Sequence, residues 1–130
     1  MKSLEHYKIL VVDDSDFSRA NIVKTLETEN FNIIGEAGNA KEATQVLKEQ
    51  SIDIAILDIV MPEVSGIELA QYISDNFKRT QIIMVSSLAG ENIIMDAIAA
   101  GASDYLQKPF KAQDLISAVG KAITQIEMEA

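Results

Sequence analysis

The sequence predicts an α/β fold in which a parallel β-sheet is covered by helices on both faces. Three observations lead to this prediction: five short apolar runs occur along the chain, segments with helical spacing separate them, and the runs lack the polar alternation of half-exposed strands. Strands buried on both faces are typical of parallel sheets, and right-handed crossovers connect them. The 130 residues contain no repeat and no Pro/Gly/Ser-rich linker, so we expect one domain over residues 1–130.

The apolar runs and the segments between them predict the elements in order. The strands are expected at residues 7–12, 33–37, 52–57, 81–85 and 105–107. In the first linking segment, residues 17–29, we expect the apolar residues at three-residue steps to face the core: Phe17, Ala20, Val23 and Leu26. Later helices are predicted from apolar sets at helical spacing: Ala40, Ala43 and Leu47; Gly66, Ala70, Ile73 and Phe77; Ile94, Ala97 and Ile98; Leu115, Val119, Ala122 and Ile126. We expect Gly101 to end the fourth helix.

Charge and residue usage exclude several classes of protein. The chain has 11 Lys+Arg against 20 Asp+Glu, which gives a net charge of −9 with its single His neutral. Phosphate backbones and anionic membrane surfaces would repel such a domain, so we expect no nucleic-acid partner and no membrane association. No apolar run approaches the roughly 20 residues that cross a bilayer. The chain also has no cysteine and no apolar signal segment, which agrees with a cytoplasmic location.

Polar side chains follow four of the five predicted strands. Asp13 and Asp14 follow the first strand, Asp58 the third, Ser86 the fourth and Lys108 the fifth. In open α/β sheets, function lies beyond the carboxyl ends of the strands, near the topological switch point. Three carboxylates within about 5 Å would repel by about 3 kcal/mol per pair at an effective dielectric of 20. Mg²⁺ suits such an all-oxygen site, and without metal at least one acid should have a raised pKa.

Each of these residues also has a simpler explanation. The acidic pair could only end a strand, with Ser15 or Asp16 capping the next helix. Lys108 could be a solvated surface charge, and Ser86 a residue of a strand-end turn. The occurrence of Asp58 at the corresponding place on another strand favours the metal site. A carboxylate beside Mg²⁺ can act as a nucleophile toward phosphorus, and nearby ammonium and hydroxyl groups can bind phosphoryl oxygens.

The strand-end residues and their neighbours form one pattern along the chain. Its members are Asp13 and Asp14; Asp58 with Met61, Pro62 and Gly66; Ser86; and Lys108 with Pro109 and Phe110. In order and spacing, this pattern resembles the receiver domain of two-component response regulators. The resemblance covers practically the whole chain, and residues 91–110 extend it to single-domain chemotaxis regulators of the CheY type. It implies a flavodoxin-like fold with five parallel strands in the order 2-1-3-4-5.

By this resemblance, Asp58 would be the phosphoacceptor and a sensor histidine kinase the donor. Asp14, Asp58 and the backbone carbonyl of Val60 would bind Mg²⁺ directly, and Asp13 would act through water. The chain would then be a signalling domain with self-catalysed phosphorylation and autodephosphorylation rather than an enzyme. Its single histidine, His6, is expected to be solvated, so the phosphoryl group must come from another molecule.

The resemblance also implies a switch. Lys108 and Ser86 would bind the phosphoryl group, and Tyr105 would be the aromatic switch residue, although it could also be an ordinary half-buried strand aromatic. The face of the fourth helix, fifth strand and fifth helix is rich in apolar residues, so we expect a downstream target protein or a second copy there, with broad helix burial as the alternative. By the same resemblance, the positions that flank the site are Val60 and Leu88, two residues after the phosphoacceptor and two after the switch hydroxyl. Both are apolar and cannot orient a hydrolytic water, so we expect slower autodephosphorylation than in a variant with Asn at 60 and Glu at 88. The Lys108-Pro109 bond is a candidate for the cis form.

Two other classes of protein stay open at this point. A haloacid-dehalogenase-like phosphatase would use Asp14 as its nucleophile, because Asp14-Ser15-Asp16 matches the Asp-x-Asp start of those enzymes. The short chain and the lack of a second acidic pair after Lys108 argue against it. A structural or binding module of the same fold would make the acids incidental. For a receiver domain, the output could be chemotaxis, a phosphorelay or transcription.

Overall fold

The computed structural model describes residues 3–129 and contains one five-stranded parallel sheet. The strands are β1 (Lys8–Val12), β2 (Asn32–Ala37), β3 (Ile54–Asp58), β4 (Gln81–Ser86) and β5 (Asp104–Gln107). Their order in the sheet is β2-β1-β3-β4-β5, and every adjacent pair is parallel. The predicted fold class and the strand order implied by the resemblance are therefore confirmed.

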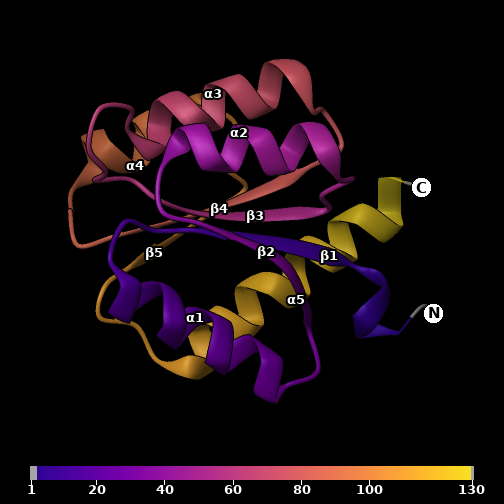
Figure 1. The fold of residues 1–130 in the computed structure, drawn as a ribbon. Coiled ribbons are helices and arrows are strands. Elements are labelled where there is room, and N and C mark those ends of the chain that lie inside the picture. The colour runs from indigo at the N-terminus through magenta and orange to yellow at the C-terminus, as the bar shows by residue number, and fades with distance from the viewer. Residues whose placement is uncertain (1–2, 130) are drawn as a thin grey trace.

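Helices cover both faces of this sheet (Figure 1). They are α1 (Asp16–Thr28), α2 (Ala40–Glu49), α3 (Gly66–Asn76), α4 (Glu91–Ala99) and α5 (Ala112–Glu129), with a short 3-10 helix, η1 (Leu4–His6), before β1. α1 and α5 lie on one face, and α2, α3 and α4 on the other. Within residues 3–129, no helix is both long and apolar enough to cross a membrane.

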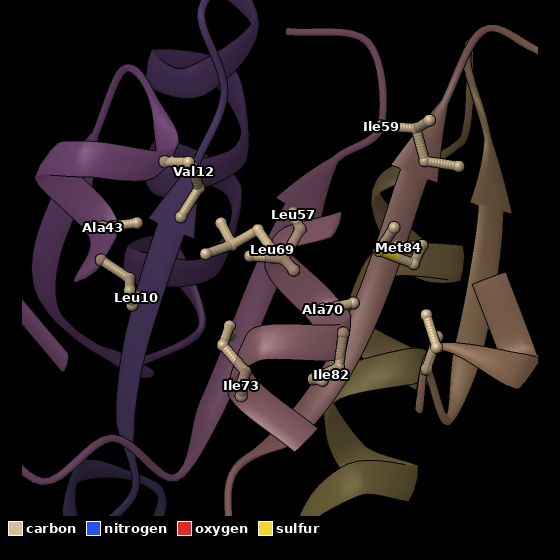
Figure 2. Close-up of a cluster of buried hydrophobic side chains, with 14 of the residues drawn as sticks. Leu10, Val12, Ala43, Leu57, Ile59, Leu69, Ala70, Ile73, Ile82 and Met84 are labelled. Carbon is tan, nitrogen blue, oxygen red and sulfur yellow. The ribbon is translucent and has the colours of Figure 1, made fainter. Parts of the chain in front are cut away.

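Each face of the sheet has its own hydrophobic core. Figure 2 shows the core under α2 and α3, where Leu57 of β3 lies beside Leu69 of α3. Met84 of β4 and Ile73 of α3 belong to the same buried cluster. All five residues of β3 are buried. Fully burying one such aliphatic side chain contributes about 1.5–3 kcal/mol. The central strands are therefore packed on both faces, and this packing places the residues at their carboxyl ends.

The two edge strands differ from the prediction that every strand is buried on both faces. β2 and β5 consist mostly of half-buried residues, whereas β3 and β4 are buried almost throughout. An edge strand has a neighbour on one side only, and the helices that cover the sheet extend less far over it. The prediction of burial on both faces was therefore wrong for β2 and β5.

The predicted apolar stripe of α1 was also wrong in part. Ile22 and Leu26 are the buried residues of this helix, whereas Phe17 is 86% exposed. A three-residue step falls about 60° short of a full helical turn, so three such steps place Phe17 about 180° from Leu26. The helix therefore presents these two residues to opposite sides, and Phe17 lies on the surface.

The helix ends are fixed by local hydrogen bonds and by glycine. Ser15, Asn39 and Ser65 cap α1, α2 and α3, each side chain accepting a hydrogen bond from a backbone N–H of the first turn. Ser15 is thus the cap at the start of α1, and Asp16 is not. Gly101 follows α4 with a φ of 108°, a conformation that favours glycine.

Candidate functional site

The acidic residues meet at the carboxyl edge of the sheet. β1 and β3 are neighbours in the sheet, and they lead into α1 and α3, which lie on opposite faces. The connections that leave these two strands therefore diverge at this edge. Asp13 and Asp14 follow β1, and Asp58 ends β3. Each carboxylate offers an oxygen within 4.8 Å of those of the other two. Asp13 is completely buried, Asp58 is 7% exposed and Asp14 is exposed, so the cluster opens to solvent through Asp14.

A close turn after β3 sets the position of Asp58. The backbone N–H of Gly66 donates to the carbonyl oxygen of Ile59 at 2.8 Å, and this contact brings the start of α3 back onto the strand end. A Cβ atom at position 66 would collide with the backbone carbonyl of Asp58. Only glycine allows this approach. Val60 lies in the same turn and is 54% exposed.

Lys108 lies between two of the carboxylates. Its Nζ is 2.8 Å from Asp13 Oδ2 and 3.6 Å from Asp58 Oδ1. The backbone N–H of Lys108 donates to the carbonyl of Ser86 at 2.8 Å, and the Lys108-Pro109 peptide bond is cis. The side chain is largely buried against the acids, so Lys108 is not a solvated surface charge.

The pKa of the Asp58 carboxyl is shifted upward in this cluster, from 3.8 to about 6. Burial is the largest cause, the Lys108 ammonium opposes it, and the charges of Asp13 and Asp14 add to it. The expectation that one acid would have a raised pKa in the absence of metal is therefore confirmed for Asp58. A divalent cation would favour the ionised form of this carboxylate, and the all-oxygen donor set fits Mg²⁺.

Two residues of α1 contact Asp13 and were not predicted from the sequence to belong to the site. The Ser18 hydroxyl donates to Asp13 Oδ2 at 2.7 Å. Arg19 donates to the backbone carbonyl of Asp13 at 2.7 Å and pairs with Asp16 and Glu36. A Ser in the first turn of a helix is usually assigned to capping, and nothing in its spacing from Asp13 indicated a contact across the turn.

A chain of hydrogen bonds links Ser86 to Tyr105. The buried Ser86 Oγ accepts from the backbone N–H of Leu88 at 3.0 Å. The Tyr105 hydroxyl donates to the backbone carbonyl of Leu88 at 2.7 Å. The half-buried Tyr105 ring also packs against the core under α2 and α3. Leu88 is therefore held at both its N–H and its carbonyl, so a single residue connects Ser86 with Tyr105.

The fold and the site define a class of protein: a doubly wound parallel α/β domain with a carboxylate cluster at its topological switch point. The model of the response regulator receiver domain family matches residues 9–120, and the chain belongs to this family.

Individual relatives agree with this membership. The chain is 37% identical over 117 residues to the chemotaxis protein CheY of Bacillus subtilis, covering 90% of this chain and 98% of that protein. Its fold is similar to a CheY-like receiver domain protein of Methanospirillum hungatei, with a TM-score of 0.89 and 26% identity over 95% of this chain and 98% of that one. It is also similar to a chain in the CheX-CheY-BeF3-Mg complex of Borrelia burgdorferi, with a TM-score of 0.86 and 32% identity over 90% of this chain and 89% of that one. The family is one of signalling domains of two-component systems, and the phosphatase alternative is not favoured.

Proposed function

We propose that residues 1–130 form a single receiver domain that accepts a phosphoryl group on Asp58 from a sensor histidine kinase. One observation carries this proposal. Asp58 lies within 4.8 Å of two further carboxylates and 3.6 Å from the Lys108 ammonium, at the carboxyl edge of the sheet. A nucleophilic carboxylate, an oxygen site for a cation and a positive charge for the transferring group are thus assembled in one place.

The chemistry follows from these positions. A carboxylate oxygen of Asp58 attacks phosphorus, the bond from phosphorus to the kinase imidazole nitrogen breaks, and that nitrogen leaves with the electron pair. Asp14, Asp58 and the Val60 carbonyl would hold Mg²⁺ directly, with Asp13 acting through water. Bound Mg²⁺ supplies positive charge that offsets the repulsion between the acids and the phosphoryl oxygens. Lys108 needs to move only a short way from Asp13 to contact those oxygens.

Phosphorylation would reach the output surface through Ser86 and Tyr105. The new phosphoryl oxygens are acceptors for the Ser86 hydroxyl, whose oxygen is bound by the Leu88 N–H. If Ser86 turns toward the phosphoryl group, Leu88 shifts with it and the hydrogen bond from Tyr105 is altered. Phosphate thereby favours one of two states of the α4-β5-α5 face.

The α4-β5-α5 face is the proposed binding surface for a downstream protein or a second copy of the chain. Met95 and Ile98 of α4 are 64% and 59% exposed, and exposed apolar side chains of this size mark interaction surfaces when they are contiguous. The relatives named chemotaxis proteins support chemotaxis as the output. A cytoplasmic location is part of the same proposal.

Intact-mass spectrometry tests the proposed function. The chain is incubated with a small acyl phosphate donor, with Mg²⁺ or with EDTA, beside an Asp58→Asn variant. We expect one phosphoryl adduct that requires both Mg²⁺ and Asp58. An adduct that persists in Asp58→Asn, or turnover of the donor that depends on Asp14, would contradict the proposal and support the phosphatase mechanism instead.

A further inference from the structure

Ser18 makes a contact with the acidic cluster that helix formation does not require. Its backbone N–H already donates to the Ser15 Oγ cap at 3.2 Å. Its hydroxyl turns back from the first turn of α1 and donates to Asp13 Oδ2 at 2.7 Å. The hydroxyl therefore binds a residue of the site and takes no part in capping the helix.

The Asp13 carboxylate has a defined set of donors. Oδ1 accepts the N–H of Ser15 at 2.9 Å, and Oδ2 accepts both the Ser18 hydroxyl and the Lys108 ammonium, at 2.7 and 2.8 Å. A carboxylate offers about four acceptor positions, about two on each oxygen. Oδ2 is thus filled by Ser18 and Lys108, and the remaining acceptor position is on Oδ1.

Binding of a phosphoryl group on Asp58 would draw the Lys108 ammonium toward Asp58 and away from its contact with Asp13. Its Nζ is now 0.8 Å closer to Asp13 than to Asp58, from the distances of 2.8 and 3.6 Å. If Lys108 were the sole donor to Oδ2, its departure would leave this oxygen unsatisfied, which is costly in a completely buried residue. With Ser18 present, Asp13 Oδ2 keeps a donor after Lys108 has moved.

We propose that Ser18 is a positioning residue that satisfies Asp13 Oδ2 and thereby releases Lys108 to the phosphoryl group. This inference rests on the proposed function of Asp58. If Ser18 acts in this way, its loss changes the affinity for the phosphoryl group and leaves the affinity for Mg²⁺ unweakened. Loss of a purely structural residue would change both affinities together. Without the hydroxyl, Lys108 is the sole donor to Oδ2 and stays with Asp13, so phosphoryl binding weakens. Mg²⁺ binding in the absence of a phosphoryl group does not weaken, because loss of Ser18 removes no metal ligand.

The experiment measures these two affinities on the intact chain by calorimetric titration. Mg²⁺ is titrated alone, and then beryllofluoride, which mimics the phosphoryl group on a carboxylate, is titrated at saturating Mg²⁺. The variants are Ser18→Ala, Ser18→Thr, which keeps the hydroxyl, and Thr25→Ala. The last is the matched control, because the Thr25 hydroxyl lies on the same helix and donates to the carbonyl of Asn21 at 2.8 Å, away from the acids.

We expect Ser18→Ala to bind beryllofluoride about tenfold more weakly, the size expected for one hydrogen bond to a charged group. Its Mg²⁺ affinity should not fall, Ser18→Thr should bind beryllofluoride like the parent, and Thr25→Ala should change neither affinity. An equal loss of both affinities in Ser18→Ala, or no loss of beryllofluoride affinity, would overturn the inference. If the parent chain itself failed to bind beryllofluoride, the proposed function of Asp58 would fall instead.

Discussion

Replacing Asp58 with Asn should stabilise the metal-free protein at neutral and higher pH. The carboxyl is 7% exposed and its pKa is raised from 3.8 to about 6, chiefly by burial. An acid with a raised pKa in the folded state contributes stability that is complete below its unfolded pKa and is lost as the pH rises through its folded pKa. Between about pH 4 and pH 8, the parent should therefore lose stability that Asp58→Asn keeps.

The magnitude follows from the size of the pKa change. The rise from 3.8 to about 6 is about two units, and one unit corresponds to about 1.4 kcal/mol, so the full effect is about 3 kcal/mol. The free energy of unfolding of Asp58→Asn should exceed that of the parent by this amount near pH 8. Near pH 4 the difference should be close to zero, because both side chains are then neutral in the folded state.

Urea unfolding in EDTA, followed by circular dichroism at several pH values, measures this difference. Asp75→Asn is the control, because it makes the same chemical change at an exposed acid of α3. Saturating Mg²⁺ should stabilise the parent more than Asp58→Asn, since a ligand that binds only the folded state stabilises it. A difference that is independent of pH, or an Asp58→Asn variant that is less stable than the parent near pH 8, would refute burial as the source of the raised pKa.

Three further predictions concern the metal, the switch and the phosphoryl lifetime. Asp14→Ala should abolish Mg²⁺ binding in calorimetry while leaving the metal-free fold as stable or more stable, because it removes repulsion among the acids; unchanged Mg²⁺ affinity would rule out the carboxylate cluster as the metal site. Ser86→Ala should accept phosphate without the chemical-shift changes around Tyr105 that the phosphorylated parent shows, and parent-like shifts would mean that the hydroxyl is not the link. A variant with Val60→Asn and Leu88→Glu should release phosphate faster than the parent at equal Mg²⁺, since polar side chains can orient a water. An unchanged or slower rate would mean that these two side chains do not set the rate of autodephosphorylation.

The sequence was sufficient for the fold class and for the strand positions, because aliphatic runs and the residues that end them are local features of the chain. Runs of aliphatic residues predicted the strands, and the carboxyl ends of parallel strands meet at one edge, so the order of residues alone indicates that Asp13, Asp14 and Asp58 lie together. The strand order came from the resemblance. Residue spacing alone does not specify which strands lie at the edges, and this is why β2 and β5 were expected to be fully buried.

Contacts that depend on side-chain direction could not be predicted. The three-residue spacing in α1 suggested a stripe, but the helical period turns Phe17 to the surface. The hydrogen bond from Ser18 to Asp13 spans the turn into α1, and the link from Ser86 to Tyr105 runs through backbone atoms of Leu88. Backbone-mediated contacts leave no pattern in side-chain identity, so they are visible only in the folded molecule.

Locating the phosphoryl group is the most direct test of the central claim. After phosphorylation by a small acyl phosphate in Mg²⁺, borohydride reduces an aspartyl phosphate to homoserine, which peptide mass spectrometry can assign to a position. The site geometry predicts homoserine at Asp58 alone. Homoserine at Asp13 or Asp14, or none in a chain that binds Mg²⁺, would contradict the assignment of Asp58 as the phosphoacceptor.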